Sequence, residues 1–155
     1  MTDKKILIAS DHAGFSLKEK IKAYLLKQGL RIQDLGTYSK ERCDYPKFTY
    51  ALAKEISGSR QGKSGILICK SGIGSSIAAN RLPGVRAALC YNVRAALLSR
   101  QHNDSNVLVL GSAFVPAKLA KRIVKVWMET EFQGGRHRRR LDQIKDIEKK
   151  IRSSR

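Results

Sequence analysis

The sequence predicts an α/β fold in which five parallel strands form a Rossmann-like, doubly wound sheet with helices on both faces and a C-terminal helix. Short apolar runs typical of β-strands alternate with segments of helical periodicity, the pattern of a parallel sheet covered by helices. The third run, residues 65–69, is continuously apolar, as expected of a central strand buried on both faces. The 155 residues suit a single domain over residues 1–155, with a core that needs no disulfide bonds.

The expected elements follow one another in a regular order. The expected strands are residues 6–9, 30–35, 65–69, 85–90 and 107–110. The first expected helix begins at Phe15 and stops at Gly29, because apolar residues on one helical face fill the interval. The second begins at Asp44, since Pro46 suits a first helical turn. This second helix is expected to end at about Ser57. A third helix is expected to pass through residues 77–79, and a fourth to run from about Val93 to Gln101. A fifth is expected to follow the apolar stripe at 119–128 until Gly134-Gly135, and the last to cover 136–155.

The C-terminal segment, residues 136–155, is expected to be an amphipathic helix at a subunit interface. It carries nine basic and three acidic residues, a local net charge of +6. Apolar residues recur in it at helical spacing, namely Leu141, Ile144, Ile147 and Ile151. No face of the sheet remains for this stripe to cover, so a partner subunit is expected to cover it. We therefore expect a homodimer, and the sequence leaves open whether dimers pair into tetramers.

The net charge favours anionic partners. The chain has 31 Lys and Arg against 13 Asp and Glu, a formal charge of +18, which attracts polyanions and phosphorylated small molecules alike. Aromatic residues make up only 6% of the chain, and no recognised DNA or RNA motif is present. Specific nucleic-acid binding is therefore disfavoured, although salt-sensitive nonspecific binding stays open.

Neither a membrane nor a secreted setting is expected. No apolar run approaches the roughly 20 residues of a membrane-spanning helix, and the N-terminal residues do not resemble a signal peptide. Cys43, Cys69 and Cys90 are odd in number and lack a CxxC spacing, which indicates free thiols rather than disulfides or a zinc site. The expected protein is soluble and cytoplasmic, with no membrane partner.

Polar residues cluster where strands are expected to end. Ligands of open parallel sheets bind beyond the carboxyl ends of the strands. Asp11 and His12 follow the first strand, Cys69 ends the third, and His102-Asn103-Asp104 precedes the fifth, so we expect them all at one edge of the sheet. Two histidines with an aspartate suit proton transfer near neutral pH. No metal site is expected, because the histidines lack HxH or HExxH spacing.

The glycine loop at residues 71–76 joins the third strand to a helix. It is neither a P-loop nor a complete dinucleotide fingerprint, and a tight turn without function explains it equally well. Its backbone amides would stabilise an oxyanion or a phosphate. Cys69 directly precedes these amides, which would favour its thiolate form and allow it to act as a base. Arg136 and Arg140 are four residues apart on one helical face and suit binding of a phosphate.

Five segments of the chain resemble one known family. They are SDHAGFSLK, DLGTYSKERCDYP, GILICKSGIGSSIAANRLPGVRAAL, LSRQHNDSNVLVLGS and FQGGRHRRR. Together and in this order they resemble ribose-5-phosphate isomerase type B, a family shared with the galactose-6-phosphate isomerases. The resemblance implies interconversion of ribose 5-phosphate and ribulose 5-phosphate through an enediol, in the non-oxidative pentose phosphate pathway. It also implies that no metal or organic cofactor takes part.

The resemblance further implies catalytic roles by position. Cys69 would be the base that moves the proton between C2 and C1, and Ser71 would assist by hydrogen bonding to the sugar hydroxyls. Asp11 and His102 would open the sugar ring. The amides that hold the enediolate oxygen would belong to Gly72, Ile73, Gly74, Ser75 and Ser76.

The substrate-binding positions are implied in the same way. Tyr45 and Asn103 match substrate-contacting positions, and the phosphate-binding set is His12, Arg136 and Arg140. The family's sites are shared between two subunits. This agrees with a C-terminal helix whose apolar stripe needs a partner.

Two residues depart from the family pattern. Lys70 stands where glycine is usual, and Ala113 stands where many members carry a phosphate-binding arginine. If position 70 required a positive φ, Lys70 would carry a steric cost. Lys70 or another basic residue is expected to compensate in part for the missing arginine.

Two further alternatives concern the activity itself. A six-carbon substrate, galactose 6-phosphate or allose 6-phosphate, would need a longer cavity between the base and the phosphate site. The family's galactose enzyme pairs two different subunits, one without the cysteine, so a chain that bears Cys69 favours the pentose. A noncatalytic protein of this fold is disfavoured, because the base, the ring-opening pair and the phosphate arginines are all present.

Overall fold

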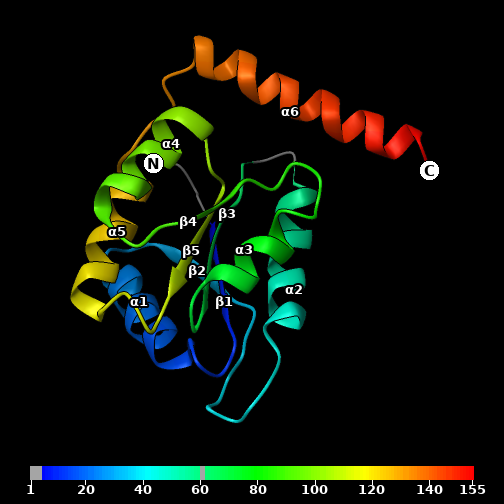
Figure 1. Ribbon diagram of the computed structural model, residues 1–155. Helices are drawn as coiled ribbons and strands as arrows, with labels where there is room; N and C mark the ends of the chain where they lie inside the picture. The colour runs from blue at the N-terminus through cyan, green and yellow to red at the C-terminus, as the bar shows by residue number, and fades with distance from the viewer. Residues whose placement is uncertain (1–4, 60–61) are drawn as a thin grey trace.

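The protein has a five-stranded sheet with helices on both faces (Figure 1), seen in a computed structural model that describes residues 5–59 and 62–155. The strands are β1 (Lys5–Ser10), β2 (Arg31–Asp34), β3 (Ser64–Cys69), β4 (Ala87–Leu89) and β5 (Val107–Gly111). The helices are α1 (Phe15–Lys27), α2 (Tyr45–Ser57), α3 (Ile73–Ala79), α4 (Val93–Asn103), α5 (Ala117–Glu129) and α6 (Arg136–Ser153).

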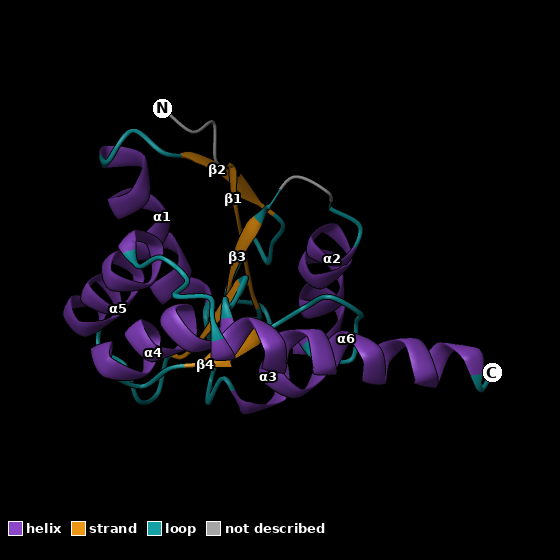
Figure 2. Ribbon diagram, turned by 90° about the horizontal axis from the view of Figure 1, so that it is seen from above, coloured by secondary structure: helices purple, strands orange, loops and turns teal. Residues whose placement is uncertain are grey.

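All neighbouring strands are parallel, in the order β2-β1-β3-β5-β4. Figure 2 shows α1, α4 and α5 on one face of the sheet and α2 and α3 on the other. The predicted doubly wound α/β fold is therefore confirmed. The chain moves outward from β1 to β2 and then returns to β3 on the other side of β1. This reversal makes the carboxyl ends of β1 and β3 the place where such folds bind ligands.

The core consists of two apolar layers, one on each side of the sheet. Alternate β3 residues belong to the two layers. Ile66 and Ile68 pack towards α1 and α5, and Leu67 packs towards α2. Every β3 residue from Gly65 to Cys69 is buried. The prediction of a central strand buried on both faces is confirmed.

Two element boundaries differ from expectation near the edge strand. β4 is shorter than the expected 85–90 because the backbone N–H of Arg86 donates to the Asn106 side chain at 2.8 Å instead of joining the start of the ladder. α4 continues to Asn103 rather than Gln101, and Asp104 ends it in a left-handed conformation at φ 44°.

The end of α5 also differs from expectation. The helix stops at Glu129, before the Gly134-Gly135 pair. At this end the Thr130 hydroxyl donates a hydrogen bond to the carbonyl of Val126. The following segment returns to α4, because the N–H of Gln133 donates to the carbonyl of Gln101 at 3.0 Å. The start of α6 is thereby placed beside the end of α4.

The predicted C-terminal helix is present as α6, which extends beyond the α/β body in Figures 1 and 2. Its buried residues are His137 and Leu141, whereas the stripe residues Ile144, Ile147 and Ile151 are 45%, 55% and 54% exposed. One contact with the body is a hydrogen bond from the N–H of Gly84 to Glu148 at 2.9 Å. Within the described ranges, no helix combines the length and apolar character needed to cross a membrane.

Candidate functional site

Cys69 lies at the carboxyl end of β3, in the position that the sequence predicts. Its side chain is buried, and the backbone N–H of Gly72 donates to its Sγ at 3.2 Å. Gly72 has a φ of 81°, a conformation that glycine adopts without strain. The loop thus turns a backbone amide towards the sulfur.

The glycine loop uses some of its amides internally. The N–H of Ile73 donates to the Ser71 hydroxyl at 3.2 Å, and the N–H of Ser76 donates to the Gly72 carbonyl at 3.0 Å. The first turn of a helix leaves its other amides without intrahelical partners, which here are those of Gly74 and Ser75. Of the five amides predicted to hold an enediolate, those of Gly72, Ile73 and Ser76 donate within the loop in this structure, and the role of the set stays a prediction.

Two side chains close the loop from the α2 side. The Tyr45 ring occupies the space that a side chain at Gly74 would fill, so the tyrosine lies directly against the loop. The Thr49 hydroxyl donates to the buried Ser75 hydroxyl at 3.1 Å. This hydrogen bond joins the first turn of α3 to α2.

Asp11 and His12 follow β1 at the same edge. The backbone N–H of Asp11 donates to the carbonyl of Ile68, the residue before Cys69, and the buried carboxylate accepts the N–H of Gly14 at 3.0 Å. His12 Nδ1 lies 3.2 Å from the backbone N and 3.0 Å from the backbone O of Cys43, so its tautomer selects one of the two bonds. We call Asp11, His12, Tyr45, Cys69 and residues 71–76 the Cys69 edge.

The two departures from the family pattern are neighbours at this edge. The carbonyl of Lys70 accepts the N–H of Ala113 at 2.9 Å, and both side chains are exposed. Among the described non-glycine residues only Asp104 has a positive φ. Lys70 therefore carries none of the steric cost of a positive φ. Its backbone is hydrogen-bonded to Ala113, the position at which many family members carry the arginine.

His102 does not join the Cys69 edge. It lies in the last turn of α4, which leads into the start of β5, so it belongs to the amino edge of the sheet. Arg86, next to the start of β4, donates to the carbonyls of Asn103 and Asp104 at 3.1 and 2.9 Å and fixes the turn there. The expectation that His12 and His102 meet at one edge of a single chain is wrong, because a helix that precedes a parallel strand ends at the opposite edge.

The residues beside His102 come from the start of α6. The imidazole ring of His137 stacks on that of His102, with centroids 4.2 Å apart and planes 10° apart. Burial lowers the pKa of His137, and the nearby His102, Arg136 and Arg140 lower it further. We call His102, Asn103, Arg136, His137 and Arg140 the His102 edge.

His137 is a candidate site residue that the sequence reasoning missed. It lies between the two predicted phosphate arginines in the segment FQGGRHRRR. In the sequence, the one indication of a role for His137 is its position next to Arg136. Its stack with His102 follows from the packing of α6 on α4 and is seen in the structure.

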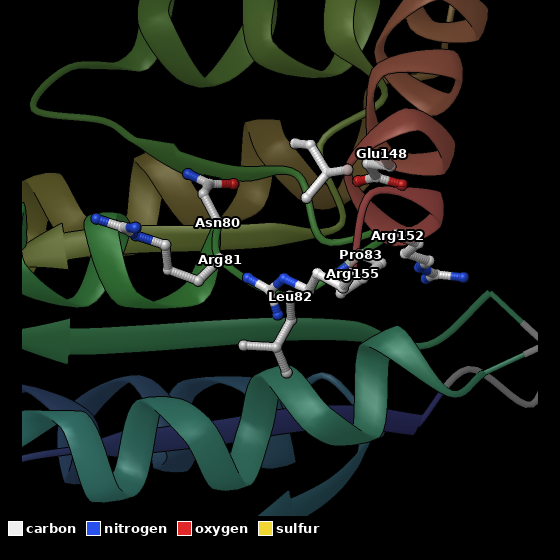
Figure 3. A pocket seen from close by; sticks show the side chains of 8 residues that line it. Asn80, Arg81, Leu82, Pro83, Glu148, Arg152 and Arg155 are labelled. Carbon is white, nitrogen blue, oxygen red and sulfur yellow. The ribbon is translucent and has the colours of Figure 1, made fainter.

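The pocket in Figure 3 is a different feature, formed where α6 lies near the turn between α3 and β4. It has a volume of about 230 Å³, and its lining includes Arg81, Arg152, Arg155 and Glu148. The lining contains no cysteine or histidine, so it offers neither of the predicted proton-transfer groups. In the part of the chain that the structure describes, no three His, Cys, Asp or Glu side chains are grouped as metal ligands would be.

The fold and the two edges define an α/β protein with a strand-end cysteine, an amide-bearing loop and a separate histidine and arginine cluster. The Ribose/Galactose Isomerase family matches this chain over residues 6–144. The chain therefore belongs to the Ribose/Galactose Isomerase family, which confirms the resemblance seen in the five segments.

Individual relatives are similar over nearly their whole length. Ribose-5-phosphate isomerase B of Escherichia coli is 46% identical over 147 residues, which cover 95% of this chain and 98% of the relative. The structure of ribose-5-phosphate isomerase B from Clostridium thermocellum superposes with a TM-score of 0.91 at 47% identity, covering 95% of this chain and 99% of that chain. The Mycoplasma genitalium enzyme with bound ribulose-5-phosphate gives 0.89 at 41% identity, covering 94% and 96%.

Proposed function

We propose that this chain is a ribose-5-phosphate isomerase, which interconverts ribose 5-phosphate and ribulose 5-phosphate through an enediol intermediate. The observation that carries the proposal is the Cys69 edge, where a buried thiol accepts an amide hydrogen bond beside two further helix-start amides. The ribulose-5-phosphate bound to the Mycoplasma genitalium relative supports this substrate.

The reaction needs a base and a site for negative charge. The hydrogen on C2 of the open aldose is weakly acidic, so the site must stabilise the enediolate more than the carbonyl. In the proposed step the Cys69 thiolate takes the C2 proton and the electron pair moves to O1, which the amides of Gly74 and Ser75 stabilise. A proton passes from O2 to O1, and the Cys69 thiol then returns its proton to C1, which leaves the ketone at C2.

The ring-opening step brings in the other edge. Asp11 and His102 are the proposed pair that moves a proton between the anomeric hydroxyl and the ring oxygen. β3 has six residues and spans about 20 Å at roughly 3.3 Å per residue, so the two edges of one chain do not meet on one sugar. We therefore propose that the active site combines the Cys69 edge of one copy with the His102 edge of a second copy.

The apolar stripe of α6 is the surface that we propose contacts the second copy. The stripe of Ile144, Ile147 and Ile151 lines a groove of about 510 Å³ together with residues of β4 and α4. We propose that residues 1–155 act as one domain whose α6 contacts the partner subunit in a homodimer. The proposed phosphate site is then formed by His12 of one copy with Arg136 and Arg140 of the other.

Subunit complementation tests the shared site. Cys69→Ala and His102→Ala chains are each expected to be nearly inactive towards ribose 5-phosphate, whereas co-expressed chains regain about a quarter of the wild-type activity. Half of the randomly paired dimers are mixed, and each mixed dimer holds one intact site of two. The measurement is the isomerisation rate of the purified mixture at equal total protein. A mixture no more active than the separate variants would contradict the shared site.

Lys70 is proposed to take over part of the role of the arginine missing at position 113. Lys70→Ala is expected to raise the KM for ribose 5-phosphate about tenfold, the effect of losing one hydrogen bond to a charged group. Adding Ala113→Arg to this variant is expected to restore the KM. The matched control Lys125→Ala removes a lysine charge that is also exposed, on α5, and should leave the KM unchanged. An unchanged KM in Lys70→Ala would refute the compensation.

The activity itself is tested by proton NMR of ribose 5-phosphate in heavy water with the purified protein. Ribulose 5-phosphate with deuterium at C1 is the expected product, because the thiol exchanges its proton with solvent. If the pentose is not turned over, galactose 6-phosphate and allose 6-phosphate are the next substrates. If these are inert too, the isomerase proposal fails, and the noncatalytic and charge-driven binding alternatives remain.

We also propose that the enzyme acts in the cytoplasm, in the non-oxidative pentose phosphate pathway, with a phosphorylated sugar as its ligand. The three cysteines support this setting, since all are free, as expected in a reducing compartment.

A further inference from the structure

Tyr91 contacts the same peptide unit that contacts the proposed base. Its hydroxyl donates to the carbonyl oxygen of Ser71 at 2.8 Å. The N–H of that peptide unit belongs to Gly72 and donates to Cys69 Sγ at 3.2 Å. A continuous chain of hydrogen bonds thus runs from the Tyr91 hydroxyl through one amide to the sulfur.

The orientation of this peptide unit is held from a second side. The Ser71 carbonyl lies against Gly111, at the end of β5, where a side chain would collide with it. The Tyr91 ring is in turn supported by Phe114, with ring centroids 5.2 Å apart.

We propose that Tyr91 is a positioning residue that acts on Cys69 through the Ser71–Gly72 peptide. A hydrogen bond to a carbonyl oxygen polarises the amide and strengthens its N–H as a donor, since linked hydrogen bonds reinforce one another. The stronger donor favours the thiolate of Cys69, the form that removes the C2 proton. This inference rests on the proposed function for its catalytic meaning, but its effect on the thiol does not depend on any substrate.

The test is Tyr91→Phe, which removes only the hydroxyl and keeps the ring against Phe114. The first readout is the rate of Cys69 alkylation by iodoacetamide at pH 7, with the alkylated residue assigned by peptide mass mapping. This rate is expected to fall about two- to threefold, in keeping with a modest cooperative effect. Cys90 does not interfere, because burial raises its pKa to about 11, and a Cys43→Ser background removes the third thiol.

The second readout is catalysis. The kcat for ribose 5-phosphate is expected to fall about threefold to tenfold while the KM changes less than about twofold, since the base is affected and substrate contacts are not. Tyr50→Phe is the matched control, because it removes a phenol hydroxyl from an exposed tyrosine of α2. It is expected to change neither rate.

The sign of the alkylation change separates the proposal from a merely structural role. If Tyr91 only held the loop in shape, its loss would loosen the loop, expose the buried thiol and speed alkylation. An unchanged or faster alkylation rate therefore overturns the proposal, even if kcat falls. A wild-type protein that isomerises no sugar phosphate would refute the proposed function, and the alkylation comparison would still decide the role of Tyr91.

Discussion

Cys69→Ala is expected to lower the isomerisation rate by about a hundredfold to ten-thousandfold, the usual contribution of a general base. The variant keeps the amides of Gly74 and Ser75, so residual activity from enediolate stabilisation is expected. The proposed ring-opening pair, Asp11 and His102, is also intact. The loss should therefore appear in kcat, with a smaller change in KM.

Proton NMR in heavy water measures this loss directly. The wild-type protein is expected to place deuterium at C1 of ribulose 5-phosphate, and Cys69→Ala is expected to slow that exchange by the same factor as turnover. Cys43→Ala is the control, since the Cys43 groups that hydrogen-bond with His12 are backbone atoms, which the substitution keeps. Exchange at the wild-type rate in Cys69→Ala would show that another group is the base.

Asp34→Asn is expected to lower the free energy of unfolding by about 3–5 kcal/mol, the cost of breaking a buried ion pair by removing one of its charges. The Lys18 side chain is 0% exposed, and its Nζ lies 2.6 and 2.7 Å from the two carboxylate oxygens of Asp34. Lys22 adds a third contact to this carboxylate at 2.7 Å. Removing the carboxylate charge leaves the buried Lys18 ammonium with the more distant and partly exposed Glu19 carboxylate, at 3.5 Å, as its remaining anionic partner.

Lys18→Met is the matched comparison. Methionine fills a similar volume and brings no charge, and Lys22 still neutralises Asp34, so the loss of stability is expected to be much smaller. Urea unfolding of the three proteins, followed by circular dichroism, measures the difference. Equal losses in the two variants would show that packing of the lysine stem, rather than its charge, stabilises this region.

The same network predicts the pH dependence. Burial by itself would raise the pKa of Asp34, but hydrogen bonds from Lys18 and Lys22 outweigh it and the pKa lies below its usual value. The stability from this group is thus present above the ordinary carboxyl pKa and is lost as the pH falls through the lowered one. Asp34→Asn should remove this part of the acid sensitivity.

The sequence by itself determined the fold and the Cys69 edge. β3 and the loop after it are contiguous in the chain, so a buried apolar run, a strand-end cysteine and glycines at 72 and 74 predict that the proposed base lies beside the loop amides. Asp11 follows β1 in the same way, and parallel strands bring their carboxyl ends to one edge. These features depend on local order and on one rule of topology.

Only the tertiary structure decided where the remaining site residues lie. His102 comes just before β5, and a helix that leads into a parallel strand must end at the amino edge, away from Cys69. The stack of His137 on His102 depends on the return of residues 130–135 to α4 through the Gln133 hydrogen bond. The hydrogen-bond chain from Tyr91 to Cys69 joins residues 22 positions apart. Sequence periodicity reports which face of an element is buried, and it carries no information about which distant backbone groups that face will meet.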